Sequence, residues 1–320
     1  MRIGSRGSAL ALAQANFVAE LLGGADAGVE VVAITTSGDR GILLGDKSRW
    51  IKELEAALLA GEVDAAVHSA KDVPTELPAG FALGAVPERV DPRDALCGAA
   101  SLQELRAGAR VGTSSLRRAA GLRALRPDLE VVALHGNVDT RLWKLEKESG
   151  ELGLDAIVLA QAGLDRLGRR VPVGCTLDEL VPAPGQGTLV VETRADDAAT
   201  RDALRAIDDP HVGACLEAER ALARALGASC NTPLGAHAVL ADDGAMTLRA
   251  FLGLPDGSAW LRDELSDRLG ASPEALGAEV ARRMRTAGAD ELLAACERLA
   301  ADNGARAGGL GSSMPEGKRL

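Results

Sequence analysis

Residues 63–74 read VDAAVHSAKDVP, and this stretch sets the fold. The apolar run Val63–Val67 predicts a buried strand, which ends in a polar loop where Lys71 and Asp72 precede a proline. Proteins with parallel sheets bind ligands in such loops, at the carboxyl ends of strands. A carboxylate there could donate a proton or balance a cation formed during a reaction. A solvated ion pair without function is the alternative, and this stretch alone slightly favours it.

The same order of strand, loop and helix continues on both sides of this stretch. Before residue 92 the pattern predicts strands at Arg2–Gly4, Val29–Thr35 and Val63–Val67, and helices at Ala9–Leu22 and Trp50–Leu59. After Pro92 it predicts strands at Ala109–Gly112, Glu130–Leu134 and Ala156–Ala160, and helices at Ser115–Leu125, Val138–Lys147 and from Gln161 to Leu167. Strands that alternate with helices imply two α/β domains, each with a parallel sheet and crossover helices.

The regular alternation of strands and helices ends at the segment VPAPGQG (181–187). This segment is rich in proline and glycine, which is typical of a linker that crosses between domains. Thr188–Glu192 is again strand-like. From about residue 210 the pattern predicts a helix at Ala214–Leu226, strands at Ala236–Leu240 and Met246–Leu252, and one final helix within Pro273–Ala301. We therefore expect a small α+β domain over 210–303, followed by a Gly/Ser-rich tail over 304–320 that is disordered.

Composition narrows the possible functions. The chain has 320 residues and a formal net charge of −10, which argues against broad binding to nucleic acid or to anionic membranes. No apolar run is long enough to span a bilayer, so a cytoplasmic location is the default expectation. The five cysteines form no C-x-x-C pair and have no histidine at ligand spacing, so no metal site is expected. Neither G-x-G-x-x-G nor a P-loop is present, which argues against a nucleotide cofactor.

The segment GTSSLRR (112–118) combines several groups that bind anions at the junction of a strand and a helix. Ser115 is a good N-cap, and helix N-termini present free N–H groups to anions. Arg117 and Arg118 in the first turn oppose the helix dipole, which makes sense if an anion neutralises them. Thr113 and Ser114 add hydroxyl groups beside them. This combination predicts a carboxylate-binding loop in preference to a solvated basic helix end.

Further cationic or hydroxyl side chains follow other predicted strands. They are Arg6, Ser8, Lys71, Arg141 and Arg166. Each alone is ordinary surface charge, but together they would line the carboxyl ends of two sheets. The sequence therefore predicts a cleft between two domains that binds a polyanionic small molecule.

Two more side chains are candidates for chemistry. Cys230 lies in GASCNTP (227–233), a polar turn between a helix and a strand, and could act as a nucleophile or attachment point. The residues alone leave it evenly balanced between an idle and a reactive thiol. His68 could act as a base, although a histidine at a strand end is more often structural.

Six motifs, in this order, resemble the porphobilinogen deaminase (hydroxymethylbilane synthase) family from about Ile3 to Ala301. They are HSAKDVP, VGTSSLRR, GNVDTR, AGLDRLG, PAPGQG and SCNTPLG. The resemblance implies two α/β domains like type II periplasmic binding proteins with a central cleft, and a small C-terminal α+β domain that carries the cofactor cysteine. It also implies that 188–205 returns to domain 1 (1–90), with domain 2 over 93–181.

The resemblance implies a transferase of tetrapyrrole biosynthesis, the route to porphyrin and heme. Four porphobilinogen molecules are joined head to tail, ammonia is released at each step, and the product is the linear hydroxymethylbilane. The chain grows on a dipyrromethane cofactor, which a thioether would attach to Cys230. Asp72 would assist departure of the amine, stabilise the cationic azafulvene-like intermediate, and interact with ring nitrogens as coupling and proton loss proceed.

The resemblance also assigns side chains to the acetate and propionate groups of cofactor and substrate. Cofactor ligands would be Lys71, Thr113, Ser114, Ser115, Arg117, Arg118 and Arg141, and substrate ligands Arg6, Ser8, Lys47 and Arg166. Lys47 lies in GDKSRW (45–50), where the family commonly has a glycine-rich segment, and His135 stands where the family often has arginine. The resemblance implies that Trp50 replaces the aromatic side chain that covers a pyrrole.

The resemblance further leads us to expect a monomer that hands its product to uroporphyrinogen-III synthase. A non-enzymatic anion-binding protein with the same cleft is the alternative function, and it would need neither Asp72 nor Cys230.

Overall fold

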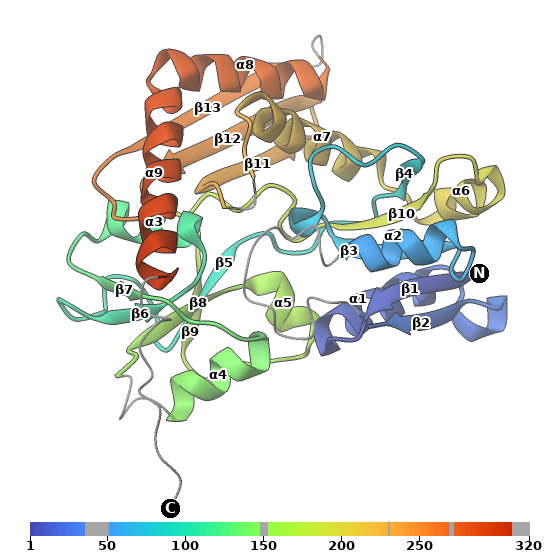
Figure 1. The fold of residues 1–320 in the computed structure, drawn as a ribbon, viewed down its shortest axis with the longest axis horizontal. Coiled ribbons are helices and arrows are strands. Elements are labelled where there is room, and N and C mark those ends of the chain that lie inside the picture. The colour runs from blue at the N-terminus through green and yellow to red at the C-terminus, as the bar shows by residue number, and fades with distance from the viewer. Residues whose placement is uncertain (36–50, 148–152, 230, 269–271, 309–320) are drawn as a thin grey trace, which may run out of the picture.

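The computed structural model describes residues 1–35, 51–147, 153–229, 231–268 and 272–308. Figure 1 shows two α/β domains, the first holding the N-terminus, and a third domain that packs against both. The expected side chains Lys47 and Cys230 lie outside the described residues, as does Trp50.

The first domain is built on a five-stranded sheet with the order β2-β1-β3-β10-β4. Its strands are β1 (Arg2–Arg6), β2 (Glu30–Ile34), β3 (Ala65–Ser69), β4 (Phe81–Ala85) and β10 (Leu189–Arg194). Its helices are α1 (Ala9–Leu21), α2 (Lys52–Leu59) and α6 (Ala198–Leu204). Alternate residues of β3 face opposite cores: Val67 packs in a cluster with residues of α1, and Ala66 in a cluster with residues of α2.

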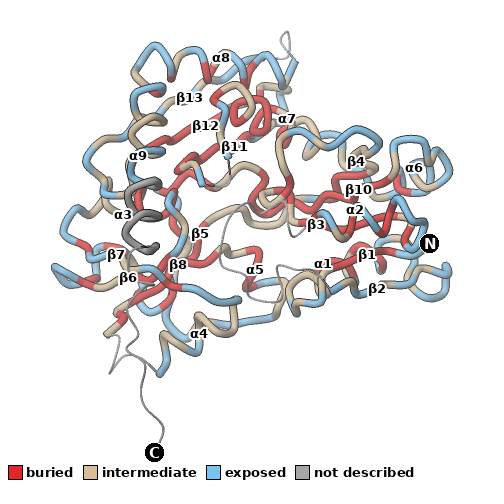
Figure 2. Tube along the Cα trace, in the orientation of Figure 1, coloured by how far each residue is buried: buried red, intermediate tan, exposed pale blue. Residues whose placement is uncertain are grey.

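The second domain has the same kind of sheet, with the order β7-β6-β8-β5-β9. Its strands are β5 (Asp94–Cys97), β6 (Arg110–Gly112), β7 (Glu130–Val132), β8 (Ala156–Ala160) and β9 (Gly174–Leu177). Its helices are α3 (Leu116–Leu125), α4 (Val138–Lys147) and α5 (Gln161–Arg166). Figure 2 shows buried residues gathered along β3, β10 and β8, where strands are covered on both faces.

The expectation of wholly parallel sheets is wrong. The pairs β1–β2, β1–β3, β6–β7 and β6–β8 are parallel, but β10 runs antiparallel to β3 and β4, and β5 runs antiparallel to β8 and β9. Both antiparallel strands directly follow a crossing of the chain between the domains. A strand that enters its sheet from the side where the other strands end must run against them, and neither hydrophobic run carries that information.

The third domain is an antiparallel sheet, β11-β12-β13, covered by helices. It comprises α7 (Pro210–Ala225), β11 (Leu234–Leu240), β12 (Ala245–Gly253), β13 (Trp260–Arg268), α8 (Pro273–Thr286) and α9 (Ala289–Gly308). The sequence did not predict β13, whose residues are largely charged. The single expected helix is two, separated at Gly288, whose φ of 103° lies in the left-handed region. Helix α9 continues beyond Gly304, where we expected the tail to begin.

One buried carboxylate connects the three domains. Glu219 of α7 is 0% exposed and accepts hydrogen bonds from Arg89 Nη1 (2.7 Å), Gly185 N (2.7 Å) and Ala238 N (2.8 Å). Arg89 lies shortly before β5, where the chain first crosses between the domains. Gly185 lies shortly before β10, in the second crossing, and Ala238 belongs to β11. Because all four groups meet out of water, Glu219 holds the third domain to both crossings.

A glycine brings the second crossing against the loop that carries Asp72. Gly185 has a φ of 73°, and a Cβ at this position would lie 2.8 Å from the Cβ of Ala70. Ala70–Asp72 form a short 3₁₀ turn directly after β3. The PGQG sequence therefore lets the backbone of the crossing pack directly on this turn.

Among the described residues, no helix is both long enough and apolar enough to cross a membrane.

His237 gives the fold a testable dependence on pH. Burial, followed by the charges of Arg89 and Arg249, lowers the pKa of His237 from 6.5 to about 3. The folded chain therefore binds this proton less readily than the unfolded chain does, and stability is lost as the pH falls from about 6.5 towards 3. We expect His237→Gln to flatten the decline in melting temperature between pH 7 and pH 4. An unchanged decline in the variant would contradict this assignment.

Candidate functional site

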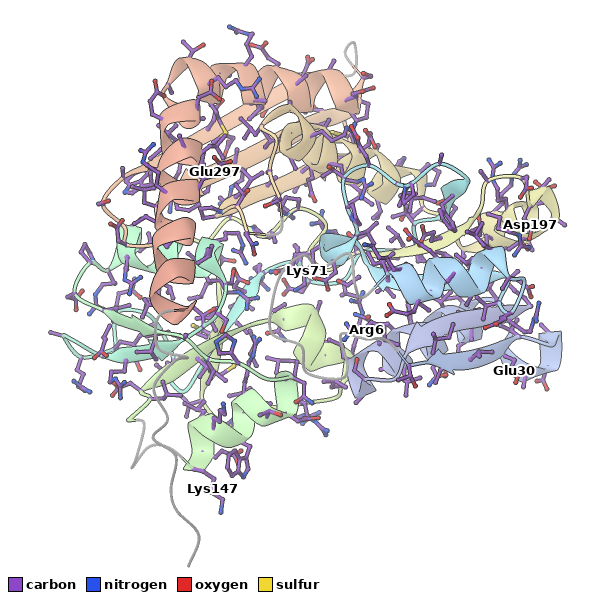
Figure 3. All side chains as sticks on the ribbon, in the orientation of Figure 1. Arg6, Glu30, Lys71, Lys147, Asp197 and Glu297 are labelled. Atoms are coloured by element: carbon purple, nitrogen blue, oxygen red, sulfur yellow. The ribbon has the colours of Figure 1, made fainter. Side chains whose placement is uncertain are left out.

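Two adjoining cavities lie between the first two domains, where strands of both sheets end. They have empty volumes of about 1920 Å³ and about 930 Å³, and their linings share Lys71, Asp72, Arg118 and Arg141. Figure 3 shows the labelled side chains of Arg6 and Lys71 in this central region between the domains. The predicted cleft is therefore present, and it brings together the loops after β1, β3 and β6 with helices α4 and α5.

Lys71 and Asp72 enter both cavities from the 3₁₀ turn after β3. The turn is closed by the backbone bond from Val73 N to Ala70 O, 3.2 Å. Lys71 Nζ lies 3.4 Å from Gln186 Oε1 in the second crossing. The strand end and the packed crossing thus fix where these two side chains reach the cleft.

The carboxylate of Asp94, at the start of β5, organises the first turn of α3. It is 0% exposed and accepts from Arg117 Nη1 (2.7 Å) and Nη2 (3.1 Å), from Arg118 Nε (2.9 Å) and from Gln186 Nε2 (2.9 Å). Burial by itself would raise the pKa of Asp94, but the charges of Arg117 and Arg118 outweigh it and hold that pKa well below its usual range. Asp94 therefore stays ionised and fixes both guanidinium groups.

The two neighbouring arginines differ in what they leave for a ligand. Arg117 also donates from Nη1 to Val181 O at 2.8 Å, so both of its terminal nitrogens are engaged within the protein. Arg118 donates from Nη1 to Val158 O at 3.0 Å, and its side chain lines both cavities. The predicted role of Arg117 as a cofactor ligand stays a prediction, and the geometry gives it a structural role as well.

Three arginines at the cavities form no ion pair among the described residues. They are Arg141 of α4, Arg166 of α5 and Arg220 of α7. Burial lowers the pKa of Arg141 and of Arg220, and it lowers the pKa of Arg166 to about 10. Nε of Arg141 and Nη1 of Arg220 are buried without a hydrogen-bond partner. Buried cations left in this state are stabilised when an anion reaches them, and guanidinium groups suit carboxylates.

The hydroxyl side chains predicted as ligands mostly serve the local backbone. Ser8 Oγ caps α1 by accepting from Ala11 N (3.3 Å), and Ser115 Oγ caps α3 by accepting from Arg118 N (3.4 Å). Ser114 Oγ donates to Leu134 O at 2.6 Å. Ser8, Ser114 and Ser115 line a cavity, whereas Thr113 is buried outside both linings, where its Oγ1 accepts from Ser115 N.

Residues on either side of Cys230 in the chain border the larger cavity. Ala228, Ser229, Asn231 and Thr232 are part of the same lining as Asp72 and Arg118. Thr232 Oγ1 accepts from Ser229 N at 2.9 Å. The third domain thus presents this segment to the same cleft as the cationic side chains.

Sequence reasoning missed Asp94, Gln186 and Arg220. Arg220 is 6% exposed and donates from Nη2 to Thr75 O at 2.8 Å. The sequence did contain one signal for Arg220: it is a charged residue on the same helix face as Leu216 and Ala223, which are both buried. A charged side chain on a buried face indicates a specific partner or ligand. Asp94 and Gln186 gave no such signal, because their partners are distant in sequence.

Fold and site together define a class: a two-domain α/β protein with a cleft lined by cationic side chains, against which a third domain packs. Comparison with known proteins then identifies the family. Residues 1–202 match the family model described as "Porphobilinogen deaminase, dipyromethane cofactor binding domain", and residues 214–286 match "Porphobilinogen deaminase, C-terminal domain". The chain belongs to the porphobilinogen deaminase family.

Curated relatives named porphobilinogen deaminase match almost the whole chain. The protein from Thiobacillus denitrificans is 45% identical over 305 residues, covering 92% of this chain and 97% of its own. The protein from Xanthomonas euvesicatoria is 47% identical over 307 residues (92% and 98%), and that from Thermus thermophilus is 44% identical over 298 residues (91% and 97%). The predicted family, the transferase class and the place in tetrapyrrole biosynthesis are confirmed.

Among solved structures, the methionine-binding protein MetQ aligns with 65% of this chain and 89% of its own at 16% identity, with a TM-score of 0.39. A periplasmic sulfonate-binding protein from Methylobacillus flagellatus aligns with 69% and 66% at 14% identity, with a TM-score of 0.35. The predicted fold class, two α/β domains around a cleft with a small C-terminal domain, is confirmed.

The family match makes dipyrromethane the cofactor of this domain. The described residues fit such a group, because a molecule that carries several carboxylates would meet the unpartnered nitrogens of Arg141 and Arg220, which both line the larger cavity.

Removing the charge of Asp94 tests its organising role. We expect Asp94→Asn to lower the free energy of unfolding by about 3–5 kcal/mol, because two buried guanidinium groups lose their shared counter-charge. Urea denaturation at neutral pH measures this. Asp202→Asn is the control, since Asp202 pairs with Arg205 on the surface and should leave stability unchanged. Equal stability of wild type and Asp94→Asn would contradict the role.

Proposed function

We propose that this chain is a hydroxymethylbilane synthase that joins four porphobilinogen molecules into a linear tetrapyrrole and releases one ammonia at each coupling. The observation that carries the proposal is the set of buried or half-buried arginines that form no ion pair among the described residues and that line the two cavities to which Asp72 also belongs. Family membership supports the reaction, and the cavity supports a substrate with several carboxylates.

We further propose that a thioether joins the dipyrromethane to Cys230. The residues on both sides of Cys230 line the larger cavity, so a group attached there would extend towards the cationic lining. When bound, dipyrromethane supplies the free pyrrole carbon to which the first substrate is joined. The tether keeps the growing chain in the cleft between couplings.

The cationic lining binds and orients the carboxylates of substrate and chain. We propose this role for Arg6, Ser8, Lys71, Ser114, Ser115, Arg118, Arg141 and Arg166, with Arg220 added from the structure. Thr113 supports the same loop from outside both linings, Arg117 lines the larger cavity while Asp94 holds its terminal nitrogens, and Lys47 stays a prediction outside the described residues. Each pyrrole brings carboxylates, and each carboxylate is stabilised more by a buried guanidinium than by a solvated one.

Asp72 places a carboxylate in this otherwise cationic surface. We propose that it assists departure of the amine and balances the positive charge that develops on the pyrrole nitrogen. Such charge stabilisation is large in a site with little water, because the opposing dipoles are fixed before the reaction begins. A protein that merely bound anions would gain nothing from a carboxylate at this position, and this disfavours the non-enzymatic alternative.

Three expectations accompany the enzyme: it acts as a monomer, it works in the cytoplasm, and it passes its product to uroporphyrinogen-III synthase.

The intact mass of the purified protein tests the tether. Expressed in a host that makes porphobilinogen, the wild type should carry an added mass equal to two linked pyrrole units, and Cys230→Ala should not. Cys215→Ala, which alters a thiol in the third-domain core, is the matched control and should keep the added mass. An unmodified wild type would contradict both the tether and the enzyme.

Replacement of Asp72 tests the catalytic carboxylate. We expect Asp72→Ala to lower kcat by about 10²-fold or more, because the developing cation loses its counter-charge. The melting temperature should stay near that of the wild type. Product formation from porphobilinogen in a steady-state assay is the measurement. Turnover close to the wild-type rate would reject the assigned role.

A further inference from the structure

His68 is a second titratable group in the cleft, and the function proposed above gives it no task. It is the fourth residue of β3 and lines the smaller cavity together with Asp72. It is only 6% exposed. Its Nε2 lies 3.0 Å from Oε2 of Glu192 on the neighbouring strand β10. The strand that leads into the catalytic turn therefore carries a histidine backed by a carboxylate.

Burying Glu192 is costly unless it serves a purpose. Its carboxylate is 0% exposed, and neither oxygen has a hydrogen-bond partner among the described residues. Its sequence neighbour Val191 and its cross-strand partner Ala66 are both buried and apolar. A side chain that only filled this space would be apolar as well. Within the described part of the chain, Nε2 of His68 is the one partner recorded close to the Glu192 carboxylate, so the carboxylate serves the imidazole.

The arrangement is that of a base oriented by a carboxylate. Glu192 lies against Nε2, which leaves Nδ1 as the other ring nitrogen that can accept a proton. The contact lacks the alignment of a full hydrogen bond, and such pairs commonly tighten only when substrate is bound. Once Nδ1 is protonated, the nearby carboxylate stabilises the imidazolium.

The proposed reaction requires a proton acceptor. At each coupling the C–N bond of the substrate's aminomethyl group breaks, and a C–C bond forms to the unsubstituted ring carbon of the terminal pyrrole. That ring carbon must then lose its proton. The amine, which arrives as an ammonium, leaves as ammonia and can take up the proton again. The coupling therefore needs no oxidant and no further reactant.

We propose that His68, held by Glu192, accepts the ring proton through Nδ1 at each coupling and passes it to the departing ammonia. This inference rests on the function proposed above. Asp72 can then stay ionised throughout the cycle as the counter-charge of the cationic intermediate. A single carboxylate could not accept the ring proton and stay ionised as a counter-charge at the same time. In this proposal His68 does the first and Asp72 the second.

Charged groups from several elements face this pair. Burial and then Glu192 raise the pKa of Glu55 on α2, while His68 lowers it. Lys71, Arg6, Arg166 and Asp72 line the same cavity as His68.

The first test compares His68→Gln with wild type and with His211→Gln, which alters an exposed histidine outside both cavities. We expect His68→Gln to keep the added mass of dipyrromethane and the KM for porphobilinogen, and to lose about 10²-fold in kcat. Porphobilinogen deuterated at its unsubstituted ring carbon should then react more slowly than the protonated substrate, because proton loss has become limiting. A kcat like that of wild type, or a lowered kcat without an isotope effect, would overturn the proposal.

The second test uses Glu192→Gln and a readout that a purely structural pair would not move. Loss of the counter-charge disfavours the imidazolium, so the neutral base persists to lower pH, and the acid limb of the kcat profile should shift to lower pH. If the melting curve shows that His68→Gln does not fold, the pH profile of Glu192→Gln is the deciding test. An acid limb at the same pH as in the wild type would overturn the proposal. Absence of turnover in the wild type would instead reject the proposed function itself.

Discussion

The buried carboxylate of Asp94 is the constraint on which the rest of the cleft depends. It begins β5, the first strand after the chain has crossed into domain 2, and it binds Gln186 of the returning crossing. It also neutralises Arg117 and Arg118, whose positions in the first turn of α3 oppose the helix dipole. The Asp94 carboxylate therefore holds the returning crossing and the two arginines of α3 together. Through Gln186 this network continues to Lys71 in domain 1.

The protein combines an acidic surface with a cationic cleft, and burial explains how both persist. The net charge is −10, yet burial lowers the pKa of Arg141, Arg166 and Arg220 at the cavities. These side chains are desolvated by their packing, and a carboxylate ligand would relieve that state. Under the proposed function, affinity for a polyanion would come from local desolvation and not from overall charge.

Local patterns predicted the elements that carry the site better than they predicted its connections. The bounds of β8 and α4 match the residues, and Ser115 caps α3 as its place before Leu116 indicates. The antiparallel direction of β5 and β10 was missed, because direction is set by where the chain enters a sheet. The partners of Asp94 lie 23, 24 and 92 residues away along the chain, beyond any periodic signal.

Two consecutive residues of α7 hold the third domain against the cleft. Glu219 ties the helix to both crossings, and Arg220 ties it to Thr75, just after the turn that carries Asp72. Cys230 follows this helix in the chain, so under the proposed function the tether and Asp72 would be held in one frame. Arg118, locked by Asp94, would give carboxylates a fixed contact, and Arg141, whose Nε has no hydrogen-bond partner among the described residues, would be available to the carboxylates of added units.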